Sequence, residues 1–481
     1  MTGLISKYKN MPVQVKASFW FLVCALLQKG ITILTTPVFT RLLSTAEYGQ
    51  YNVFKSWMGI VTIFVSLNLG AGVYIQGLVK FGEERERYAS SLQGLTSALV
   101  IIWSVIYIIF HSFWNKLFGL TTVQMSAMLV MIWATAAFNF WAFEQRVLYK
   151  YKVLVMLTLL VSMAQATAGI LLGINARDKV TAIILGMALV ELIGYSGLYV
   201  IQMRRGKKFF YAKFWKYAIF FNIPLIPHYL SQIVLNSADR IMISNMIGDD
   251  EAGIYSLAYS VSSIMVIFNS ALMQTINPWI YQKIKAKKIK DIENIAYISL
   301  IIVAGLNLIL ILLAPEVISI FAPKAYYDAI WVVPPIAMSV YFLYSYDLFG
   351  EFAFYYEKTN LIMITSVMGA VFNVLLNYIF INIYGYMAAG YTTLACYMIY
   401  GISHYILMNK ICDKYCGGIR PYETKKIIFI TLLFLFSGFL LVMVYKYLIV
   451  RYGLIAVIAI FVIMKRNILI DLFKKGQRSL S

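Results

Sequence analysis

Charged residues are scarce in this chain: Asp, Glu, Lys and Arg make up 13% of its 481 residues, whereas hydrophobic residues make up 61%. A soluble domain carries roughly 25% charged residues because its surface faces water. At about half that fraction, a chain of this length has too little polar side chain to cover a soluble globule. The composition therefore excludes a soluble domain and indicates that lipid surrounds the protein.

Cysteine and histidine are also rare, with four and three residues in the chain. Cys412 and Cys416 have the spacing of half a zinc site, but no second pair or histidine cluster accompanies them. The chain also lacks the Gly-x-x-x-x-Gly-Lys-Ser/Thr loop that cradles nucleotide phosphates. We therefore expect no metal, no cofactor and no ATP hydrolysis by this chain.

Long apolar segments are abundant and have the length of membrane spans. A helix needs about 20 apolar residues to cross the hydrocarbon layer, because each residue adds 1.5 Å. The pattern predicts an all-α integral membrane protein with about 14 transmembrane helices. The expected spans are 17–37, 51–76, 91–113, 122–143, 152–174, 180–202, 215–236, 253–277, 295–314, 330–350, 360–381, 387–408, 427–446 and 453–470.

The net charge of +20 lies in short loops beside the apolar spans. Basic residues concentrate in alternate loops, most densely in 204–216, 283–290 and 410–426, and such loops stay in the cytoplasm during insertion. We therefore expect both termini to be cytoplasmic, the first span to be an uncleaved anchor, and anionic lipids rather than nucleic acid to be the partner. The opposite loops hold only Arg41, Lys116, Arg177, Lys179, Arg240, Lys324, Lys446 and Arg451.

Two short segments resemble each other across the halves of the chain. Residues 47–51 read Glu-Tyr-Gly-Gln-Tyr and residues 251–255 read Glu-Ala-Gly-Ile-Tyr, and each follows a span that contains proline. Repeated halves are common in secondary transporters. The pattern predicts an N-terminal six-helix bundle (1–208), a second six-helix bundle (209–412), and two further helices with a cytoplasmic tail (413–481).

Several charged residues fall inside the expected spans, where a charge costs about 2.5–3.5 kcal/mol. In the first span, threonines follow Lys29 at helical spacing and form one stripe with it. In the second span, small and hydroxylated residues follow Lys55 in the same way. Such stripes also suit simple helix packing, and charges near span ends can reach the membrane surface. We interpret Lys29, Lys55 and Arg240 as the lining of a hydrated cationic cavity that suits an anion such as a phosphate.

Three acidic residues complete the set of candidate site residues. Asp239 precedes Arg240 and is either part of the cavity or its simple ion-pair partner. Asp347 and Glu351 lie one helical turn apart, so two ionised carboxylates would repel each other. We select these two, by position alone, as candidate groups for coupling transport to an ion gradient.

The junction after the first span resembles that of the Wzx-type oligosaccharide flippases of the multidrug/oligosaccharidyl-lipid/polysaccharide (MOP) superfamily. The similar segments are 40–44 with 47–51, 238–243 with 251–255, Asn-Pro-Trp-Ile-Tyr at 277–281, Glu-Lys-Thr at 357–359, Asn-Val-Leu-Leu-Asn at 373–377 and 384–389. One departure is Asn382, where the family often has Ile-Pro before Tyr-Gly.

This resemblance implies two six-helix bundles around a central cavity in a bacterial cytoplasmic membrane. It implies that the protein moves undecaprenyl-pyrophosphate-linked oligosaccharides to the outer leaflet for O-antigen, capsule or exopolysaccharide synthesis, with a proton or sodium gradient as the energy source. Polysaccharide polymerase and glycosyltransferases are the protein partners expected alongside this lipid-linked substrate.

Alternative functions fit less well. A peptidoglycan-precursor flippase or multidrug exporter would share the architecture, although the basic residues disfavour export of cationic drugs. A polymerase, ligase or glycosyltransferase would need positioned catalytic residues, usually in a larger loop domain than this chain offers. A structural scaffold would have no use for Lys29. We therefore expect a transporter and not an enzyme.

Overall fold

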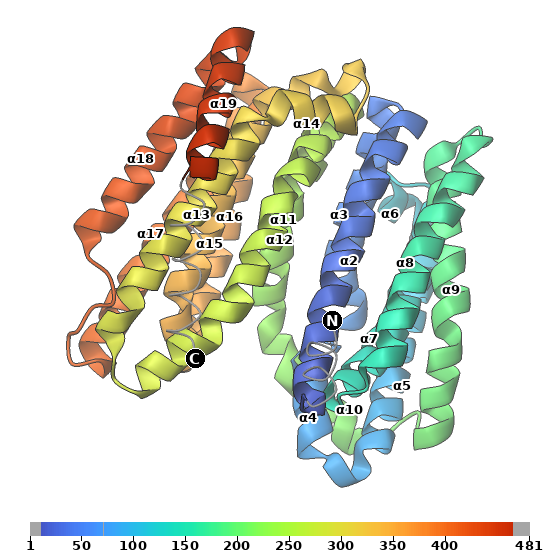
Figure 1. The fold of residues 1–481 in the computed structure, drawn as a ribbon. Helices are drawn as coiled ribbons and strands as arrows, with labels where there is room; N and C mark the ends of the chain where they lie inside the picture. Colours follow the sequence, from blue (N-terminus) through green and yellow to red (C-terminus); the bar gives the residue numbers. More distant parts are fainter. Residues whose placement is uncertain (1–10, 71, 465–481) are drawn as a thin grey trace, which may run out of the picture. The chain divides into compact units, whose positions relative to one another are not determined.

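The structure, a computed structural model, describes residues 11–70 and 72–464, which form helices joined by short turns, with no strand in these ranges (Figure 1). The chain divides into two compact units, Met1–Gly253 (unit 1) and Ile254–Ser481 (unit 2). Each is described by itself below. This division reflects packing, and the repeat boundary expected at residues 208/209 stays a prediction.

The helices confirm an all-α multi-pass membrane protein. Ten described segments are long and apolar enough to span a membrane, and an eleventh results if the bent pair Lys324–Trp331 and Val333–Tyr355 counts as one span. The three remaining predicted spans also fall on helices, namely α3, α17 and α19. Predicted span 453–470 extends past Met464, and its last residues lie outside the described part, as do the predicted basic tail and Lys7 and Lys9.

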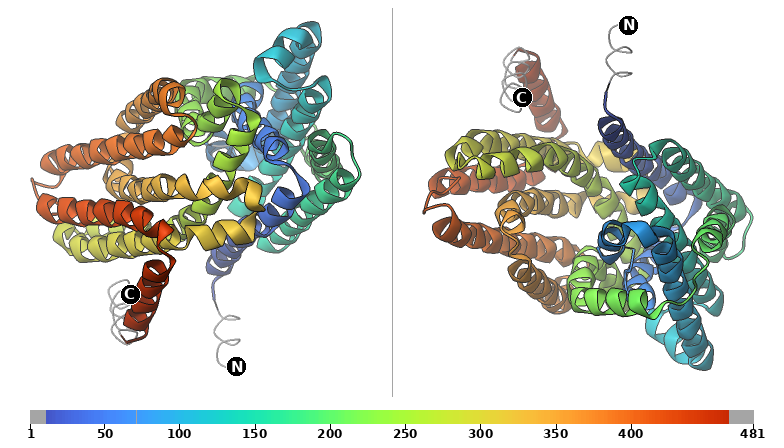
Figure 2. Two further views of the ribbon diagram at one scale, coloured as in Figure 1. Left: turned by 90° about the horizontal axis from the view of Figure 1, so that it is seen from above. Right: turned by 90° about the horizontal axis from the view of Figure 1, so that it is seen from below.

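Unit 1 contains the helices up to α11 and the first turn of α12. Figure 2 shows the ribbon from two further directions, in the colours of Figure 1. Several helices of unit 1 begin at side-chain caps that the sequence encodes; α3, for example, starts with a capping box between Ser44 and Glu47. The helices are α2 (Val13–Leu42), α3 (Thr45–Ser66), α4 (Val73–Lys80), η1 (Gly82–Glu84), α5 (Arg85–Ile109), α6 (His111–Phe118), α7 (Thr122–Val147), α8 (Tyr151–Ile174), α9 (Lys179–Gly206), α10 (Ala212–Asn222), η2 (Ile223–Leu225), α11 (Ile226–Met246) and α12 (Asp249–Lys285).

The second predicted span is a broken helix rather than a continuous one. Helix α3 ends at Ser66, and Leu67 and Asn68 both have a φ of 49° before α4 begins at Val73. The Nδ2 amide of buried Asn222 donates to the carbonyl oxygens of Leu67 (2.7 Å) and Asn68 (3.0 Å). A neighbouring helix thus satisfies carbonyls that the break releases, as irregular backbone within a membrane requires.

The two repeated segments lie against each other at the starts of α3 and α12. A Cβ added to Gly49 would collide with the carbonyl of Asp249, and one added to Gly253 would collide with the carbonyl of Thr45. The hydroxyl of Thr45 also donates to Asp250, and Gln50 Nε2 donates to Asp249 Oδ2 at 2.9 Å. The glycines that the repeat shares therefore permit a close, reciprocal helix contact.

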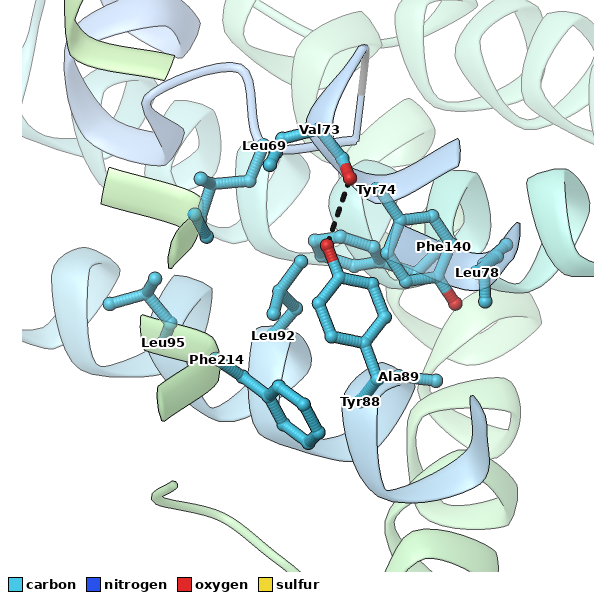
Figure 3. Packing of buried hydrophobic residues seen from close by; sticks show 11 residues of the cluster. Leu69, Val73, Tyr74, Leu78, Tyr88, Ala89, Leu92, Leu95, Phe140 and Phe214 are labelled. Atoms are coloured by element: carbon cyan, nitrogen blue, oxygen red, sulfur yellow. Dashed lines mark hydrogen bonds between the residues drawn. The ribbon is translucent and has the colours of Figure 1, made fainter. Parts of the chain in front are cut away.

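Aromatic and aliphatic side chains fill the core of unit 1 where α4, α5, α7 and α10 meet (Figure 3). The Tyr88 hydroxyl is buried there and donates to the carbonyl of Val73 at 2.9 Å, across the broken-helix segment. Gly77 lies directly against the Tyr88 ring, with no room for a Cβ. This core holds α4 in place after the break.

Unit 2 continues from α12 through seven further α-helices. Two of them, α18 and α19, fall within residues 413–481, and the division of the chain into two six-helix bundles and two further helices stays a prediction. The helices of unit 2 are η3 (Ile289–Asp291), α13 (Ile292–Leu312), α14 (Ala314–Phe321), η4 (Lys324–Trp331), α15 (Val333–Tyr355), α16 (Thr359–Tyr384), α17 (Met387–Tyr415), α18 (Thr424–Met443), η5 (Val444–Lys446) and α19 (Leu448–Met464).

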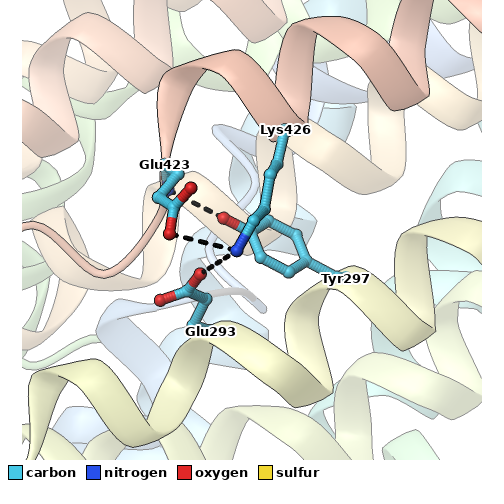
Figure 4. A network of polar contacts seen from close by, with 4 residues as sticks. All are labelled: Glu293, Tyr297, Glu423 and Lys426. Atoms are coloured by element: carbon cyan, nitrogen blue, oxygen red, sulfur yellow. Dashed lines mark hydrogen bonds and ion pairs between the residues drawn. The ribbon is translucent and has the colours of Figure 1, made fainter.

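A polar network attaches the start of α18 to α13 (Figure 4). Lys426 Nζ lies 3.1 Å from Glu293 Oε1 and 3.0 Å from Glu423 Oε1, and the backbone N–H of Glu423 donates to the Tyr297 hydroxyl at 2.7 Å. The nearby Lys426 ammonium lowers the pKa of the exposed Glu423 carboxyl. Because exposed ion pairs contribute little, this network fixes the position of α18 more than it stabilises the fold.

Candidate functional site

Helices α3 and α11 pack along each other within unit 1 and bring two predicted cations together. Lys55 on α3 is exposed although Phe54 and Ser56 beside it are buried, and its Nζ lies 5.1 Å from the centre of the Tyr51 ring. Lys55 and Arg240 of α11 are near enough to repel each other electrostatically. Arg240 Nη1 donates to the carbonyl of Asn236 at 3.1 Å, which orients the guanidinium along its own helix.

Both lysines lie well inside their helices and not in the connecting turns. Helix α3 starts at Thr45, so Lys55 lies about 15 Å along the helix from that end. Helix α2 ends at Leu42, so Lys29 lies about 20 Å along the helix from that end.

Lys29 shares one side of α2 with three threonines. At 100° per residue, Lys29, Thr32, Thr36 and Thr40 fall within an arc of about 80°, while exposed Leu34 points about 140° and exposed Leu26 about 60° away from Lys29. Lys29 itself is exposed and forms no ion pair within residues 11–70 and 72–464. The predicted stripe is thus a real face of the helix, with Thr36 and Thr40 buried and Lys29 open.

The acidic candidates lie in different places. Asp239 in α11 is only 1% exposed, whereas its neighbour Arg240 is partly exposed. Asp347 and buried Glu351 lie on α15 of unit 2, where they interact electrostatically, and Tyr281 also interacts electrostatically with Glu351. The assignment of Asp347 and Glu351 as coupling groups stays a prediction.

A cavity of about 150 Å³, lined by both apolar and polar side chains, lies inside unit 1 between α3, α5 and α7. Thr62 and Ser66, from the predicted α3 stripe, line it two and three turns beyond Lys55. Asn68 of the broken-helix segment lines it too, together with Thr96, Thr135 and Asn139. The hydroxylated stripe of α3 therefore contributes to an internal cavity and not only to helix packing.

Sequence reasoning missed two buried carboxyl groups of unit 1, those of Glu144 and Glu191. Glu191 hydrogen-bonds to Thr135 and Gln165, and Glu144 accepts from Gln202 Nε2 at 3.2 Å. Glu191 lies near the middle of the predicted span 180–202, and its charge there was a signal comparable to that of Lys29. In unit 2, sequence analysis noted Asn373 and Asn377 only as a motif; both are buried, and Thr392 donates to Asn377.

Two solved structures have folds similar to this one. "Lipid II flippase MurJ, inward closed conformation" matches with a TM-score of 0.68 at 14% identity, covering 93% of this chain and 99% of that chain. A multidrug resistance MATE family transporter of the MOP superfamily, in an inward-facing conformation, matches with a TM-score of 0.59 at 13% identity, covering 80% and 95%. The fold is that of MOP-superfamily transporters.

Family comparison identifies the chain more closely. The family described as "Polysaccharide biosynthesis protein" matches residues 15–283, more than half of the chain, and the chain belongs to this family. The MatE family description matches residues 224–379. A Haemophilus influenzae protein named "Uncharacterized membrane protein" is 23% identical over 376 residues, which cover 74% of this chain and 87% of that protein.

Proposed function

We propose that the protein flips an undecaprenyl-pyrophosphate-linked oligosaccharide from the inner to the outer leaflet of a bacterial cytoplasmic membrane, as a Wzx-type flippase. The observation that carries this proposal is the pair of repelling cations, Lys55 and Arg240, on two helices that pack along each other. A pyrophosphate between them turns mutual repulsion into two attractions, because each cation then faces an anion.

The physical problem of flipping explains the need for such a site. A pyrophosphate and sugar hydroxyls lose their hydrogen bonds to water in hydrocarbon, at a cost of several kcal/mol for each polar group. Basic side chains and hydroxyl-rich helix faces replace water for the headgroup, while the lipid tail stays in the bilayer. Alternating access then exposes the headgroup to one side at a time.

Family membership and a structural neighbour support the same chemistry. The family description concerns polysaccharide biosynthesis, and the neighbour named as a lipid II flippase acts, by its name, on a lipid. We further propose that both termini are cytoplasmic, that Lys29 extends the cationic site, and that glycosyltransferases supply the substrate while a polymerase takes the product.

Export of another substrate is the second candidate, and the match to the MatE family over residues 224–379 favours it. Repelling Lys55 and Arg240 argue against cationic drugs as that substrate, because a third positive charge between them would add to the repulsion. A peptidoglycan precursor also carries a pyrophosphate, so only its sugar distinguishes it from a polysaccharide repeat unit.

The test is deletion of the gene, followed by identification of the lipid-linked sugar that accumulates inside the cell. We expect a pyrophosphate-linked repeat unit to accumulate and surface polysaccharide to disappear. Arg240→Ala, Lys55→Ala and Lys29→Ala should each fail to restore export while still inserting in the membrane. Each lost charge-assisted contact costs about 1.5–3 kcal/mol, or roughly a 10–150-fold lower rate.

Lys116→Gln serves as the control, since Lys116 is an exposed cation on the short helix α6 of the same unit. It should restore normal export. Full export by an Arg240→Ala and Lys55→Ala double variant would disprove the role of the cation pair. Accumulation of a peptidoglycan precursor would instead assign the alternative substrate.

A further inference from the structure

Glu191 is a buried carboxyl group in the middle of α9, with only 7% of its surface exposed. Both of its oxygens are hydrogen-bonded to neutral groups on other helices. Thr135 Oγ1 of α7 lies 2.9 Å from Oε2, and Gln165 Nε2 of α8 lies 2.7 Å from Oε1. Glu191 takes part in no ion pair within the described ranges, so no cation compensates a negative charge there.

Apart from Tyr195, the ionisable groups on the described helices around Glu191 do not interact electrostatically with it. Helix α9 packs against α8, α7, α5 and α3. Tyr195, one turn further along α9, is the group whose ring interacts electrostatically with Glu191. The other ionisable residues on these five helices are Glu47, Tyr48, Tyr51, Lys55, Arg85, Glu86, Arg87, Tyr88, Tyr107, Glu144, Arg146, Tyr151, Lys152, Lys179, Tyr199, Arg204 and Arg205.

Thr135 connects Glu191 to the cavity of unit 1. The same threonine that hydrogen-bonds to Glu191 also lines the cavity, as do Thr62 and Ser66 of α3. A volume of about 150 Å³ is enough to hold water, since one water molecule needs only about 10–15 Å³ of such space. Thr96 Oγ1 lines this cavity, is buried and has no hydrogen-bond partner among the described residues, which is the situation that a bound water resolves.

We propose that Glu191 is a proton-binding site in unit 1, loaded from the water-filled cavity through the hydroxyl of Thr135. A hydronium ion in the cavity gives a proton to Thr135 Oγ1, while the hydroxyl proton of Thr135 passes to Glu191 Oε2. The hydronium becomes water, Thr135 is unchanged, and Glu191 becomes a neutral carboxylic acid. Release follows the reverse order. Only the link from this proton to transport rests on the proposed function.

The groups around Glu191 favour a proton over a metal cation. Hard cations such as Ca²⁺ and Mg²⁺ take several oxygen ligands at short distances. Here one of the two contacts comes from an amide N–H₂ group, that of Gln165, which donates to the carboxyl and offers no oxygen in this orientation. A neutral carboxylic acid needs no counter-charge in a buried site, whereas an unpaired carboxylate carries a large desolvation cost.

Infrared difference spectroscopy on the full-length protein in lipid vesicles tests the proposal without any substrate. A pH jump should produce a carboxylic-acid C=O band that Glu191→Gln removes. Thr135→Val keeps the carboxyl but removes its hydrogen bond, so the band should shift in frequency and respond at least tenfold more slowly. Persistence of the band in Glu191→Gln, or a band that responds to sodium at constant pH, would overturn the proposal.

Glu144→Gln is the matched control, because Glu144 is a buried glutamate of the same unit with a hydrogen bond to Gln202 and is not among the residues lining the cavity. It should keep the band that Glu191→Gln removes. If Glu191→Gln does not fold, the Thr135→Val shift in otherwise intact protein decides the question, since an unshifted band places the titrating carboxyl elsewhere.

A second readout links the site to transport. In cells, Glu191→Gln should lower polysaccharide export at least tenfold and make the remainder insensitive to external pH, whereas Glu191→Asp should retain a pH response. Unchanged pH dependence in Glu191→Gln would exclude coupling through this group. If the protein does not export polysaccharide at all, the infrared result still stands, so the two proposals fail separately.

Discussion

At the residue scale, Asn222 shows how one amide holds a break in a membrane helix. Its Nδ2 donates to two carbonyls, Leu67 and Asn68, at the point where α3 stops. Those residues have positive φ and so are not continuing a helix. The position of Asn68 in the wall of the unit 1 cavity makes this break part of the candidate site.

We expect Asn222→Ala to destabilise the protein by about 2–6 kcal/mol, because the carbonyls of two half-buried residues lose their donor at roughly 1–3 kcal/mol for each group. Thermal unfolding in detergent measures the effect. The comparison variant is Asn382→Ala, whose exposed side chain bonds only to its own helix at Tyr378. Equal unfolding temperatures for the two variants would show that Asn222 does not support the break.

At the scale of elements, the reciprocal contact between α3 and the start of α12 explains why the repeated segments share a glycine. Gly49 and Gly253 each face a backbone carbonyl of the other segment. Backbone cannot give way as a flexible side chain can, so any larger residue forces the two helix starts apart. The capping of α3 by Ser44 and Glu47 fixes where that helix begins and hence where Gly49 lies.

Gly49→Ala or Gly253→Ala should therefore separate these helix starts, at an overpacking cost of about 1–3 kcal/mol. Labelling of a Thr45→Cys reporter by a membrane-impermeant maleimide should increase in either glycine variant. Gly197→Ala is the control, because nothing lies within 4 Å of a Cβ added at that helical glycine. Unaltered labelling in both test variants would contradict the close contact.

At the scale of the whole molecule, the sequence predicted the architecture well because lipid imposes a simple rule on spans. Within the described residues, the predicted spans fall on helices, although span 51–76 is broken between α3 and α4, and the repeated segments occupy matching helix starts. The position of Lys55 about three turns into α3 was harder to predict, since the helix begins at a cap before the apolar run. The neighbours of Glu191 were not predictable, because Gln165 and Thr135 meet it only through the packing of three separate helices.

Unit 1 thus carries two kinds of ionisable group with different proposed tasks. Lys55 and Arg240 are suited to a phosphorylated headgroup, and Glu191 to a proton. A transporter needs both a substrate site and a site for the driving ion, and coupling requires that each state of one favours a state of the other. Asp347 and Glu351 in unit 2 remain a second candidate for the coupling site.

The most direct test of the cationic site is a flipping assay with the purified protein in lipid vesicles. A fluorescent polyprenyl-pyrophosphate-linked oligosaccharide in the outer leaflet is quenched by an impermeant reductant, and protection from quenching reports movement across the bilayer. The protein should protect the pyrophosphate-linked probe, and Lys55→Gln with Arg240→Gln should lower the rate at least 100-fold while Lys116→Gln leaves it unchanged. Equal rates for the double variant and the unaltered protein would contradict the account.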